Sequence, residues 1–393
     1  MPLNFINILA LLLSVITLTP KNLAAAMYQL PTRGDNMVGQ IQHIKVRKGD
    51  TMVELARQLD IGYEEIVTAN PHLDPWLIKV DSQLIIPSQY ILPSQPWEGV
   101  IVNIAEMRLY YFPPRQNNER GIVITFPVSI GRSLSPTPEG TFRVIDKIQN
   151  PVWTVPTAVR EEHKNNGKPI DAIIPAGPDN PLGDYAIVLD KPSYLIHGTN
   201  KPYSIGRKVS RGCLRLYPDD IEQLSNRIAR GTIVHIINEP IKTGRLNNIV
   251  YIKHQNFVIT DKKIRDGITR EYFQDVKRSY RRLENYQLDK IKTLLSFNDG
   301  ISRPLWALNE HTVAPQQLYL AIAPNFKIIN KQVFNQHILN LSLKIRQDTC
   351  DSNTCFKIGP IRSIGLRQAI AENIKHSFGV GSYNLSSSHV DTR

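Results

Sequence analysis

The chain has 393 residues, of which 41% are hydrophobic and 21% charged, an ordinary composition for a soluble globular protein. This length allows two or three domains. The formal net charge of +12 favours anionic partners such as membrane surfaces and anionic polymers. Because no nucleic-acid-binding motif is present, nucleic acid is excluded as an expected partner.

The N-terminus has the pattern of an export signal. Phe5–Leu18 is an apolar run of 14 residues, which as a helix spans about 21 Å, against about 30 Å for a bilayer core. Ala24–Ala26 provides small residues before a cut after Ala26, so residues 1–26 are predicted to be a signal peptide. No Lys or Arg precedes the run, which leaves an uncleaved anchor as the alternative. No cysteine lies near the cut, so a lipoprotein is not expected.

Residues 43–87, after a predicted linker over 27–42, have the pattern of a small α+β module. Apolar and charged residues alternate around Ile44, which is typical of a half-buried strand. The run Thr51–Glu54 is a capping-box pattern, which marks a helix start. The predicted elements are a strand at Ile44–Val46, a helix over Val53–Leu59, a helix over Tyr63–Val67 that ends at Asn70–Pro71, and a strand at Gln83–Pro87. Their order is βααβ.

Three short motifs in this module resemble those of a LysM domain: Gly49–Thr51, Ala69–Pro71 and Leu84–Pro87. LysM domains bind glycans that contain N-acetylglucosamine, including peptidoglycan. The resemblance implies that Gly49, Asp50 and Thr51, with the loop Trp76–Val80, contact glycan. The alternative is that these residues only form turns.

Residues 98–239 are predicted to form a mainly β domain. Residues 88–97, rich in proline, are expected to be a stiff spacer before it. Pro127 interrupts one apolar run, so that run is predicted to be an edge or bulged strand. The predicted strands are Val100–Ile104, Arg108–Phe112, Ile122–Ile130, Ile187–Leu189, Tyr194–His197 and Thr232–Ile237, and the one predicted helix is Ile221–Ala229, capped at Pro218–Asp220.

Within this domain, Cys213 and His197 pair a potential thiol nucleophile with a potential base. Cys213 lies in the run Ser210–Arg215, and His197 is sixteen residues upstream. A thiol attacks carbonyl groups as thiolate, and because its ordinary pKa is about 8.5, a neighbouring imidazole must accept its proton. A lone cysteine or histidine is more often a core residue, so the flanking residues decide.

The flanking motifs resemble the active site of the L,D-transpeptidases of the YkuD type. The matching motifs, in chain order, are Ile130–Gly131, Thr137–Gly140, Ile174–Gly183, His197–Thr199 and Ser210–Arg215. The resemblance covers about Gly99–Glu239 and is closest to the ErfK/YbiS branch, which is found in Gram-negative envelopes. It implies a YkuD-like β-sandwich and a reaction without a metal or organic cofactor.

The resemblance also implies a mechanism. Cys213 attacks a peptidoglycan stem peptide at the bond between the third-position diamino acid and D-Ala, while His197 takes and returns the proton. D-Ala leaves, a thioester acyl-enzyme remains, and an amine attacks it. The expected acceptor is an outer-membrane protein lysine, with a second stem peptide, which gives a 3→3 cross-link, as a close second.

Backbone groups around the pair have expected roles. The N–H groups of Arg211, Gly212 and Cys213 are expected to form an oxyanion pocket. The carbonyl at Gly198 is expected to fix the imidazole tautomer, and Gly198 and Thr199 are predicted to belong to the substrate-binding residues.

Two charged positions complete the expected site. Arg215 lies two residues after Cys213, so in a strand the two side chains share a face, where Arg215 can bind a stem carboxylate. A structural salt bridge is an equal alternative for it. Many relatives have histidine where this chain has Arg211, which excludes a helper imidazole there. The loop Gly177–Gly183 is expected to be part of a cap over the substrate.

These observations predict an exported, periplasmic L,D-transpeptidase whose partners are peptidoglycan stem peptides and glycan strands. No transmembrane segment is expected after signal cleavage. Three alternatives stay open: a hydrolase such as an L,D-carboxypeptidase that uses the same acyl-enzyme, a non-catalytic LysM wall-anchoring protein, and a cysteine protease. The last usually has an Asn or Asp orienter and cleaves between L residues.

Residues 245–393 resemble no family and are expected to be α+β. They contain 22 Lys and Arg against 12 Asp and Glu. A helix is predicted over Arg270–Ser296, and its basic cluster Lys277–Arg282 is expected to be a solvated face. Cys350 and Cys355 are candidates for a disulfide that leaves Cys213 free, with two free thiols as the alternative. The tail Ser382–Arg393 is expected to be disordered.

Overall fold

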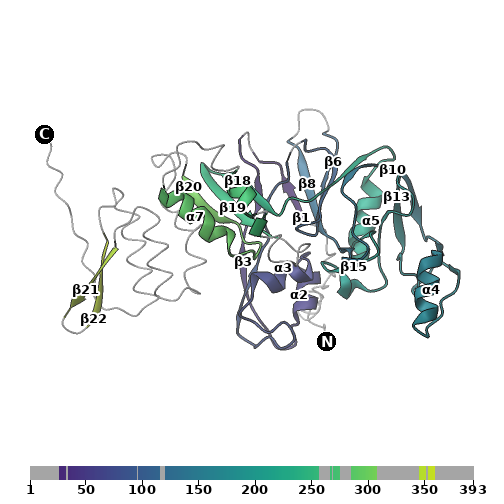
Figure 1. Cartoon of the computed structure of the whole chain (residues 1–393), viewed down its shortest axis with the longest axis horizontal. Helices are drawn as coiled ribbons and strands as arrows, with labels where there is room; N and C mark the ends of the chain where they lie inside the picture. Colours follow the sequence, from purple (N-terminus) through teal and green to yellow (C-terminus); the bar gives the residue numbers. More distant parts are fainter. Residues whose placement is uncertain are drawn as a thin grey trace, which may run out of the picture.

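The computed structural model describes residues 26–31, 34–94, 96–115, 120–255, 266–267, 269–274, 285–307, 345–350 and 353–358 (Figure 1). For residues 345–350 and 353–358 it describes the backbone alone. The predicted signal run, the basic cluster Lys277–Arg282 and the C-terminal tail therefore lie outside the described residues.

A curled sheet of nine strands forms the catalytic domain (Figure 1). Neighbouring strands are antiparallel except for the pairs β6–β17 and β14–β16, which are parallel. A bulge between Val144 and Asp146 divides β10, whose first part pairs with β17 and whose second part pairs with β13, so the sheet bends there. In spatial order the strands are β1 (Ala26–Gln29), β8 (Ile122–Pro127), β7 (Arg108–Phe112), β6 (Gly99–Asn103), β17 (Ile233–Ile237), β10 (Gly140–Gln149), β13 (Tyr185–Leu189), β14 (Leu195–His197) and β16 (Leu214–Arg215).

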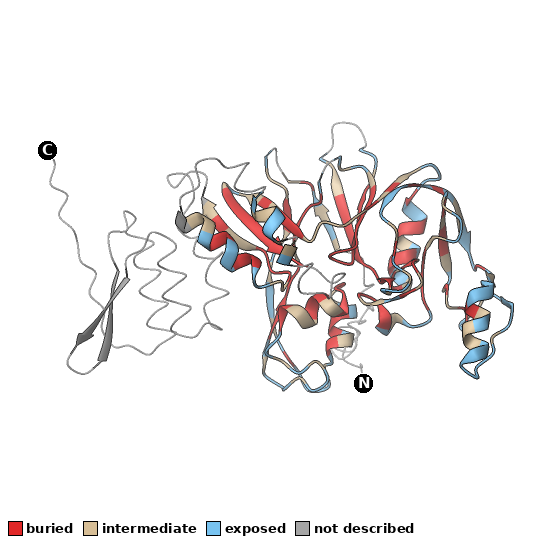
Figure 2. Ribbon diagram, in the orientation of Figure 1, coloured by how far each residue is buried: buried red, intermediate tan, exposed pale blue. Residues whose placement is uncertain are grey.

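One helix, α5 (Pro218–Arg227), covers the concave part of this sheet and contributes to its core. Pro218 stands at the first helical position, where its missing N–H costs nothing, and Asp219 and Asp220 lie in the first turn. Ile221 and Leu224 are fully buried against strand residues such as Ile187. Figure 2 shows this buried layer in the centre of the domain. The prediction of a mainly β catalytic domain is confirmed.

The small module has the predicted βααβ order: β3 (Gln42–Lys45), α2 (Met52–Gln58), α3 (Tyr63–Ala69) and β4 (Gln83–Ile86). Thr51 is the N-cap of α2, and its hydroxyl accepts a hydrogen bond from the N–H of Glu54 at 3.2 Å. The buried amide of Asn70 bonds both Ile66 and Ile85, which fastens the end of α3 to β4.

The two predicted linkers are wrong. Residues 27–42 contain most of β1 as well as β2 (Met37–Gly39), and residues 88–97 contain β5 (Gln89–Ile91). β1 pairs with β8 of the large sheet. β2 and β5 pair with each other to form a two-stranded ribbon. Side chains of this ribbon are buried against the large sheet on one side and against the C-terminal strands on the other. These strands are too short for a periodic signal, and their partners are distant in sequence.

The prediction for Pro127 is also wrong in part. β8 is not an edge strand, because β1 covers its outer side. Pro127 is the last residue of β8, where the absence of its N–H interrupts no later pair of that strand.

The C-terminal region begins with a separate sheet and helix. β18 (Ile241–Leu246), β19 (Ile249–His254) and β20 (Arg303–Ala307) form an antiparallel sheet that packs on α7 (Asn285–Leu295). β21 (Ile345–Cys350) and β22 (Asn353–Ile358) form a hairpin that holds both candidate disulfide cysteines, whose side chains lie outside the description. Within the described residues, no helix is long and apolar enough to cross a membrane.

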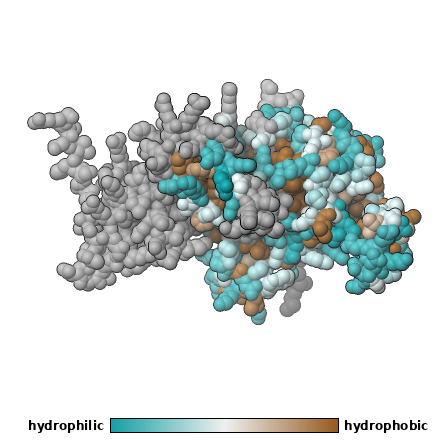
Figure 3. All heavy atoms as spheres, viewed as in Figure 1, coloured by the Kyte–Doolittle hydropathy of each residue, from teal (hydrophilic) through white to brown (hydrophobic). Residues whose placement is uncertain are grey.

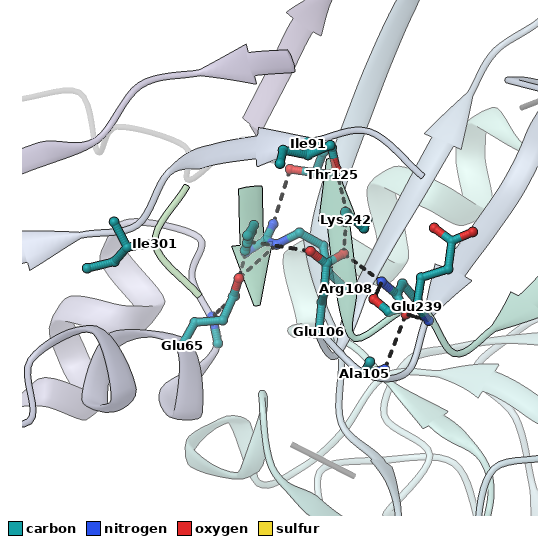
Figure 4. A network of polar contacts seen from close by, with 12 residues as sticks. Glu65, Ile91, Ala105, Glu106, Arg108, Thr125, Glu239, Lys242 and Ile301 are labelled. Atoms are coloured by element: carbon teal, nitrogen blue, oxygen red, sulfur yellow. Dashed lines mark hydrogen bonds and ion pairs between the residues drawn. The ribbon is translucent and has the colours of Figure 1, made fainter. Parts of the chain in front are cut away.

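Two buried ion pairs connect the three parts of the molecule (Figure 4). Arg108 of β7 binds both carboxylate oxygens of Glu65 in α3, at 2.7 and 3.2 Å, and neither side chain is more than 2% exposed. Glu106, in the turn before Arg108, accepts from Lys242 of β18 at 2.7 Å. Burial raises the pKa of Glu106, but Lys242 and Lys253 outweigh that effect and lower it to about 2.

Candidate active site

Cys213 lies in a tight turn between β15 (Lys208–Ser210) and β16. Gly212 has φ +106°, and a Cβ at this position would come within 2.9 Å of the Tyr194 ring, so glycine is required. The hydroxyl of Ser210 donates to the carbonyl of Cys213 at 2.5 Å and accepts from the N–H of Gly212 at 3.1 Å. The turn that carries the thiol is therefore held from inside by one side chain.

His197 ends β14 and is buried. Its Nδ1 lies 2.7 Å from the carbonyl oxygen of Gly198. A carbonyl oxygen only accepts, so Nδ1 carries the proton and Nε2 presents a lone pair. This is the contact that the sequence suggested for Gly198, and it gives His197 the tautomer that a general base needs.

The parallel pairing of β14 and β16 brings the two motifs together. His197 lies opposite Arg215, and Cys213 lies in the turn that leads directly into β16. The thiol of Cys213 donates to the carbonyl of Ser193 at 3.4 Å.

Electrostatics keep this pair uncharged at rest. Burial, and then the charge of Arg215, lowers the pKa of His197 to about 4. Burial raises the pKa of Cys213, against smaller opposite effects of a hydrogen bond from Leu195 and the charge of Arg215. At neutral pH these directions favour a thiol at Cys213 and a neutral imidazole at His197.

Arg215 fits the binding interpretation better than the structural one. Within the described part of the chain, its guanidinium forms no salt bridge, and its Nε is buried without a hydrogen-bond partner. Its charge acts on both Cys213 and His197. An unpaired cation beside the nucleophile can receive an anionic group of a substrate.

A small subdomain lies beside the nucleophile turn. It consists of β11 (Trp153–Thr154), α4 (Thr157–Asn165) and β12 (Ile173–Ile174). Glu162 of α4 pairs with Arg211 at 2.7 Å and with Arg132 at 3.1 Å, and the hydrogen bond from Arg132 is the main cause of its lowered pKa. Arg211 thus anchors this subdomain.

The remaining expected roles have mixed support. The N–H of Gly212 donates to Ser210, so the N–H groups of Arg211 and Cys213 are the remaining oxyanion candidates. The buried hydroxyl of Thr199 accepts from the N–H of Lys201 at 3.0 Å, which makes it a turn residue.

The loop Gly177–Gly183 is held against the histidine motif. Asn180 donates to the carbonyl of Pro151 at 2.8 Å, and its side-chain oxygen accepts from Leu182. Gly183 has φ +67° and approaches Thr199 so closely that a Cβ would lie 2.7 Å from its nitrogen. The loop therefore packs beside the histidine motif, and its expected role as part of a cap over the substrate stays a prediction.

In the small module, two of the three expected glycan-binding residues have structural tasks. Asp50 accepts from the N–H of Arg47 at 2.7 Å, and Thr51 caps α2. Gly49 has φ +93°, and a Cβ at this position would meet no described atom within 4 Å, so there is open space beside the turn. The exposed apolar residues lie in the loop between α3 and β4, where Trp76 is 80% and Leu77 74% exposed. Figure 3 shows apolar surface at the tip of this module.

Comparison with known proteins agrees with this geometry. The L,D-transpeptidase catalytic domain family, YkuD, matches residues 98–236, and the LysM domain family matches residues 44–87. The chain is 41% identical over 227 residues to the probable L,D-transpeptidase YcfS of Escherichia coli K12, an alignment that covers 56% of this chain and 69% of YcfS. The chain belongs to the L,D-transpeptidase family.

Other members of this L,D-transpeptidase family are similar to the same degree. The probable L,D-transpeptidase ErfK/SrfK of E. coli K12 is 42% identical over 221 residues, with 56% of this chain and 70% of that protein covered. Among solved structures, L,D-transpeptidase 3 from Mycobacterium tuberculosis is 19% identical, with 55% of this chain and 99% of that chain covered and a TM-score of 0.26.

Two features of this L,D-transpeptidase site had not been assigned a role from the sequence. Thr137 accepts from the N–H of Gly131 at 2.9 Å and donates to the carbonyl of Gly212 at 3.0 Å, so it supports the turn that carries Cys213, although the sequence pattern assigns its motif no specific role. Glu162, between Arg132 and Arg211, lies in no motif, and only the fold brings it to the site.

The lowered pKa of His197 predicts an unusual pH profile. Because the general base must be neutral, kcat/KM should fall on the acid side with an apparent pKa near 4 rather than at the ordinary 6.5. The measurement is D-Ala release from a tetrapeptide substrate at a series of pH values. Arg215→Gln removes a positive neighbour and should move this limb to higher pH.

Folding must be followed in the same buffers. Between pH 6.5 and 4 the unfolded state takes up a proton at His197 that the folded state does not, so stability falls as pH falls through that window. Circular dichroism separates this loss from protonation of a folded enzyme. An acid limb at or above pH 6.5 in folded protein would contradict the assignment of His197.

Proposed function

We propose that this L,D-transpeptidase is exported to the periplasm and acts through a Cys213 thioester on peptidoglycan stem peptides. The observation that carries the proposal is the pairing of β14 with β16, which brings the Cys213 and His197 motifs together, with Nδ1 of the imidazole on the carbonyl of Gly198 and Nε2 as the proposed acceptor of the thiol proton. Arg215 supplies an unpaired cation beside this pair. These are the groups that an acyl transfer from a peptide with free carboxylates requires.

The proposed reaction has two halves. In the first, Cys213 Sγ bonds to the carbonyl carbon of the third-position diamino acid, its proton passes to His197 Nε2, and the proton then goes to the departing amine of D-Ala. In the second, an acceptor amine attacks the thioester, loses a proton to His197, and restores the thiol of Cys213. Arg215 binds a carboxylate of the donor stem, and N–H groups of the nucleophile turn stabilise the oxyanion.

A purified-protein assay tests this proposal. Incubation with a disaccharide-tetrapeptide, followed by mass spectrometry, should show loss of D-Ala and a new amide to an added diamino acid acceptor. Products that contain only water in place of D-Ala would favour the L,D-carboxypeptidase alternative. Absence of any acyl-enzyme or product would favour a wall-anchoring protein without activity.

The LysM module is proposed to bind the glycan strand through its exposed loop. Trp76→Ala should reduce sedimentation of the protein with purified peptidoglycan sacculi several-fold, because an exposed indole provides a stacking surface for sugar rings. Leu134→Ala, which removes a 90% exposed apolar side chain from the catalytic domain, is the matched control and should bind as wild type. Both variants should release D-Ala from soluble stem peptide at the wild-type rate. Equal sedimentation of Trp76→Ala and wild type would move glycan binding elsewhere.

The acceptor is proposed to be a lysine of an outer-membrane protein, with a stem peptide as the second candidate. The support is the resemblance to the ErfK/YbiS branch and the similarity to E. coli ErfK/SrfK. Cells that lack this protein should contain fewer muropeptides that carry a peptide of the anchored protein and an unchanged amount of 3→3 dimers, as measured by a muropeptide profile. The reverse profile would assign the cross-linking reaction instead.

A further inference from the structure

A buried pair of carboxyl groups lies between the LysM module and the catalytic domain. Asp60, at the end of α2, is 9% exposed, and Asp220, in the first turn of α5, is 4% exposed. The two side chains lie close enough for each to affect the pKa of the other. The backbone nitrogen of Ala26, the first residue of β1, donates to Asp60 Oδ2 at 2.9 Å.

No cation in the described part of the chain neutralises this pair. Arg108 is a buried cation whose charge acts on both aspartates, but both oxygens of Glu65 already bind it. Its other donors go to the hydroxyl of Thr125 and to the backbone carbonyl of Asp60. The charge of Arg108 is therefore balanced by the carboxylate of Glu65, and the carboxyl groups of the two aspartates have no cation of their own.

One oxygen of each aspartate also lacks a hydrogen-bond donor. Within the described residues, Asp60 Oδ1 and Asp220 Oδ2 are buried without a donor. Burial raises the pKa of Asp60 to about 7 and raises that of Asp220 well above its usual range. A buried carboxyl that lacks donors is costly, so the site as described needs more N–H groups and positive charge.

The backbone nitrogen of Ala26 is the group that can supply both the N–H donors and the positive charge. As a peptide nitrogen, it offers the aspartates one N–H and no charge. As the first residue of a chain it would offer an ammonium with three N–H groups and a full positive charge. Ala26 also belongs to strand β1, where it pairs with the buried Thr125 of β8.

We propose that the mature protein begins at Ala26, and that the Asp60–Asp220 pair is the binding site for its α-ammonium group. This processing site rests on the export that the proposed function includes. Hydrolysis by a leader-removing peptidase adds water across the Ala25–Ala26 peptide bond, which leaves a carboxylate on Ala25 and an amine on Ala26. That amine takes a proton and is held by the two aspartates.

The inference differs by one residue from the cut that the sequence pattern favours. A cut after Ala26 would remove the nitrogen that contacts Asp60 and one of the four residues of β1 that pair with β8. A cut after Ala25 keeps alanine at the end of the leader, with the aliphatic Leu23 two residues before it. The last residue of the leader is a small alanine in both cases, whereas only the cut after Ala26 also has a small residue, Ala24, two positions earlier.

The first test is N-terminal sequencing of the full chain after expression in a Gram-negative host. The expected sequence of the exported protein starts Ala-Met-Tyr-Gln. A protein that starts at Met27, or that retains Met1, overturns the proposal.

The second test uses purified protein with defined ends and does not depend on export. A fusion is cleaved to give a chain that starts at Ala26, and a matched chain carries two extra glycines before Ala26. The Ala26 form should have the higher Tm. At pH 7 its α-amine should react about tenfold more slowly with an acylating reagent than the same amine in Asp60→Asn, because the Asp60 carboxylate raises the amine pKa by about one unit.

Asp220→Asn gives a second comparison if Asp60→Asn does not fold, and it should increase the labelling rate in the same direction. Equal Tm values for the two ends together with equal labelling rates would overturn the pairing. D-Ala release is measured in the same preparations. Loss of that activity would bear on the proposed function alone, because neither the N-terminal sequence nor the labelling rate depends on catalysis.

Discussion

Replacing Cys213 with alanine should abolish both D-Ala release and the formation of an acyl-enzyme, because no other group in the described site can form the thioester. Replacing His197 with alanine should leave a slow reaction, reduced about 10²–10⁴-fold, because the thiol then loses only its general base. The two variants are compared by single-turnover assay and by the intact mass of the protein after incubation with substrate or with a carbapenem, which by family resemblance acylates this cysteine.

The fold should tolerate the change at Cys213. Its side chain is partly exposed and donates one long hydrogen bond, to the carbonyl of Ser193 at 3.4 Å. The thermal unfolding curve and sedimentation with sacculi should therefore match wild type. Full activity of Cys213→Ala would exclude the assigned nucleophile.

Replacing Arg108 with alanine should produce the largest loss of stability. Glu65 would then be a buried carboxylate without its cation, and breaking such a pair from one side costs about 3–5 kcal/mol. Urea unfolding measures this free energy. The loss should affect the LysM module and the catalytic domain together, because the pair joins α3 to β7.

Matched variants distinguish this effect from general sensitivity to mutation. The double variant Arg108→Met with Glu65→Gln removes both charges and should recover much of the stability. Lys45→Ala breaks the pair with Asp81, in which both side chains are about 70% exposed, and should change stability little. If Arg108→Ala unfolds at the wild-type urea concentration, the buried pair does not hold the two domains together.

Elements with strong local signals could be predicted from the sequence. The cap at Thr51, the proline at the start of α5 and the stop at Asn70 are local features, and each structural element lies within a few residues of its prediction. β1, β2 and β5 could not be predicted, because each has three or four residues and depends on a partner that the sequence does not indicate.

The candidate site shows the same division. Cys213 and His197 lie in recognisable motifs, and the pairing of β14 with β16 brings these motifs together. Glu162 and Asp60 lie in no motif, and their importance comes from arginine or carboxyl partners on distant segments. Sequence spacing carries no information about such contacts, because the curl of the sheet creates them.

The LysM module interrupts the catalytic domain instead of preceding it. β1 lies in the catalytic sheet before the module, and β6 continues that sheet after it. A protease that cuts once in the exposed loop around Trp76 would therefore produce two fragments that each contain strands of the same sheet. These fragments would appear separately on a denaturing gel and migrate as one particle in native gel filtration, since the β1–β8, β2–β5 and β3–β4 pairings all join residues on opposite sides of the cut.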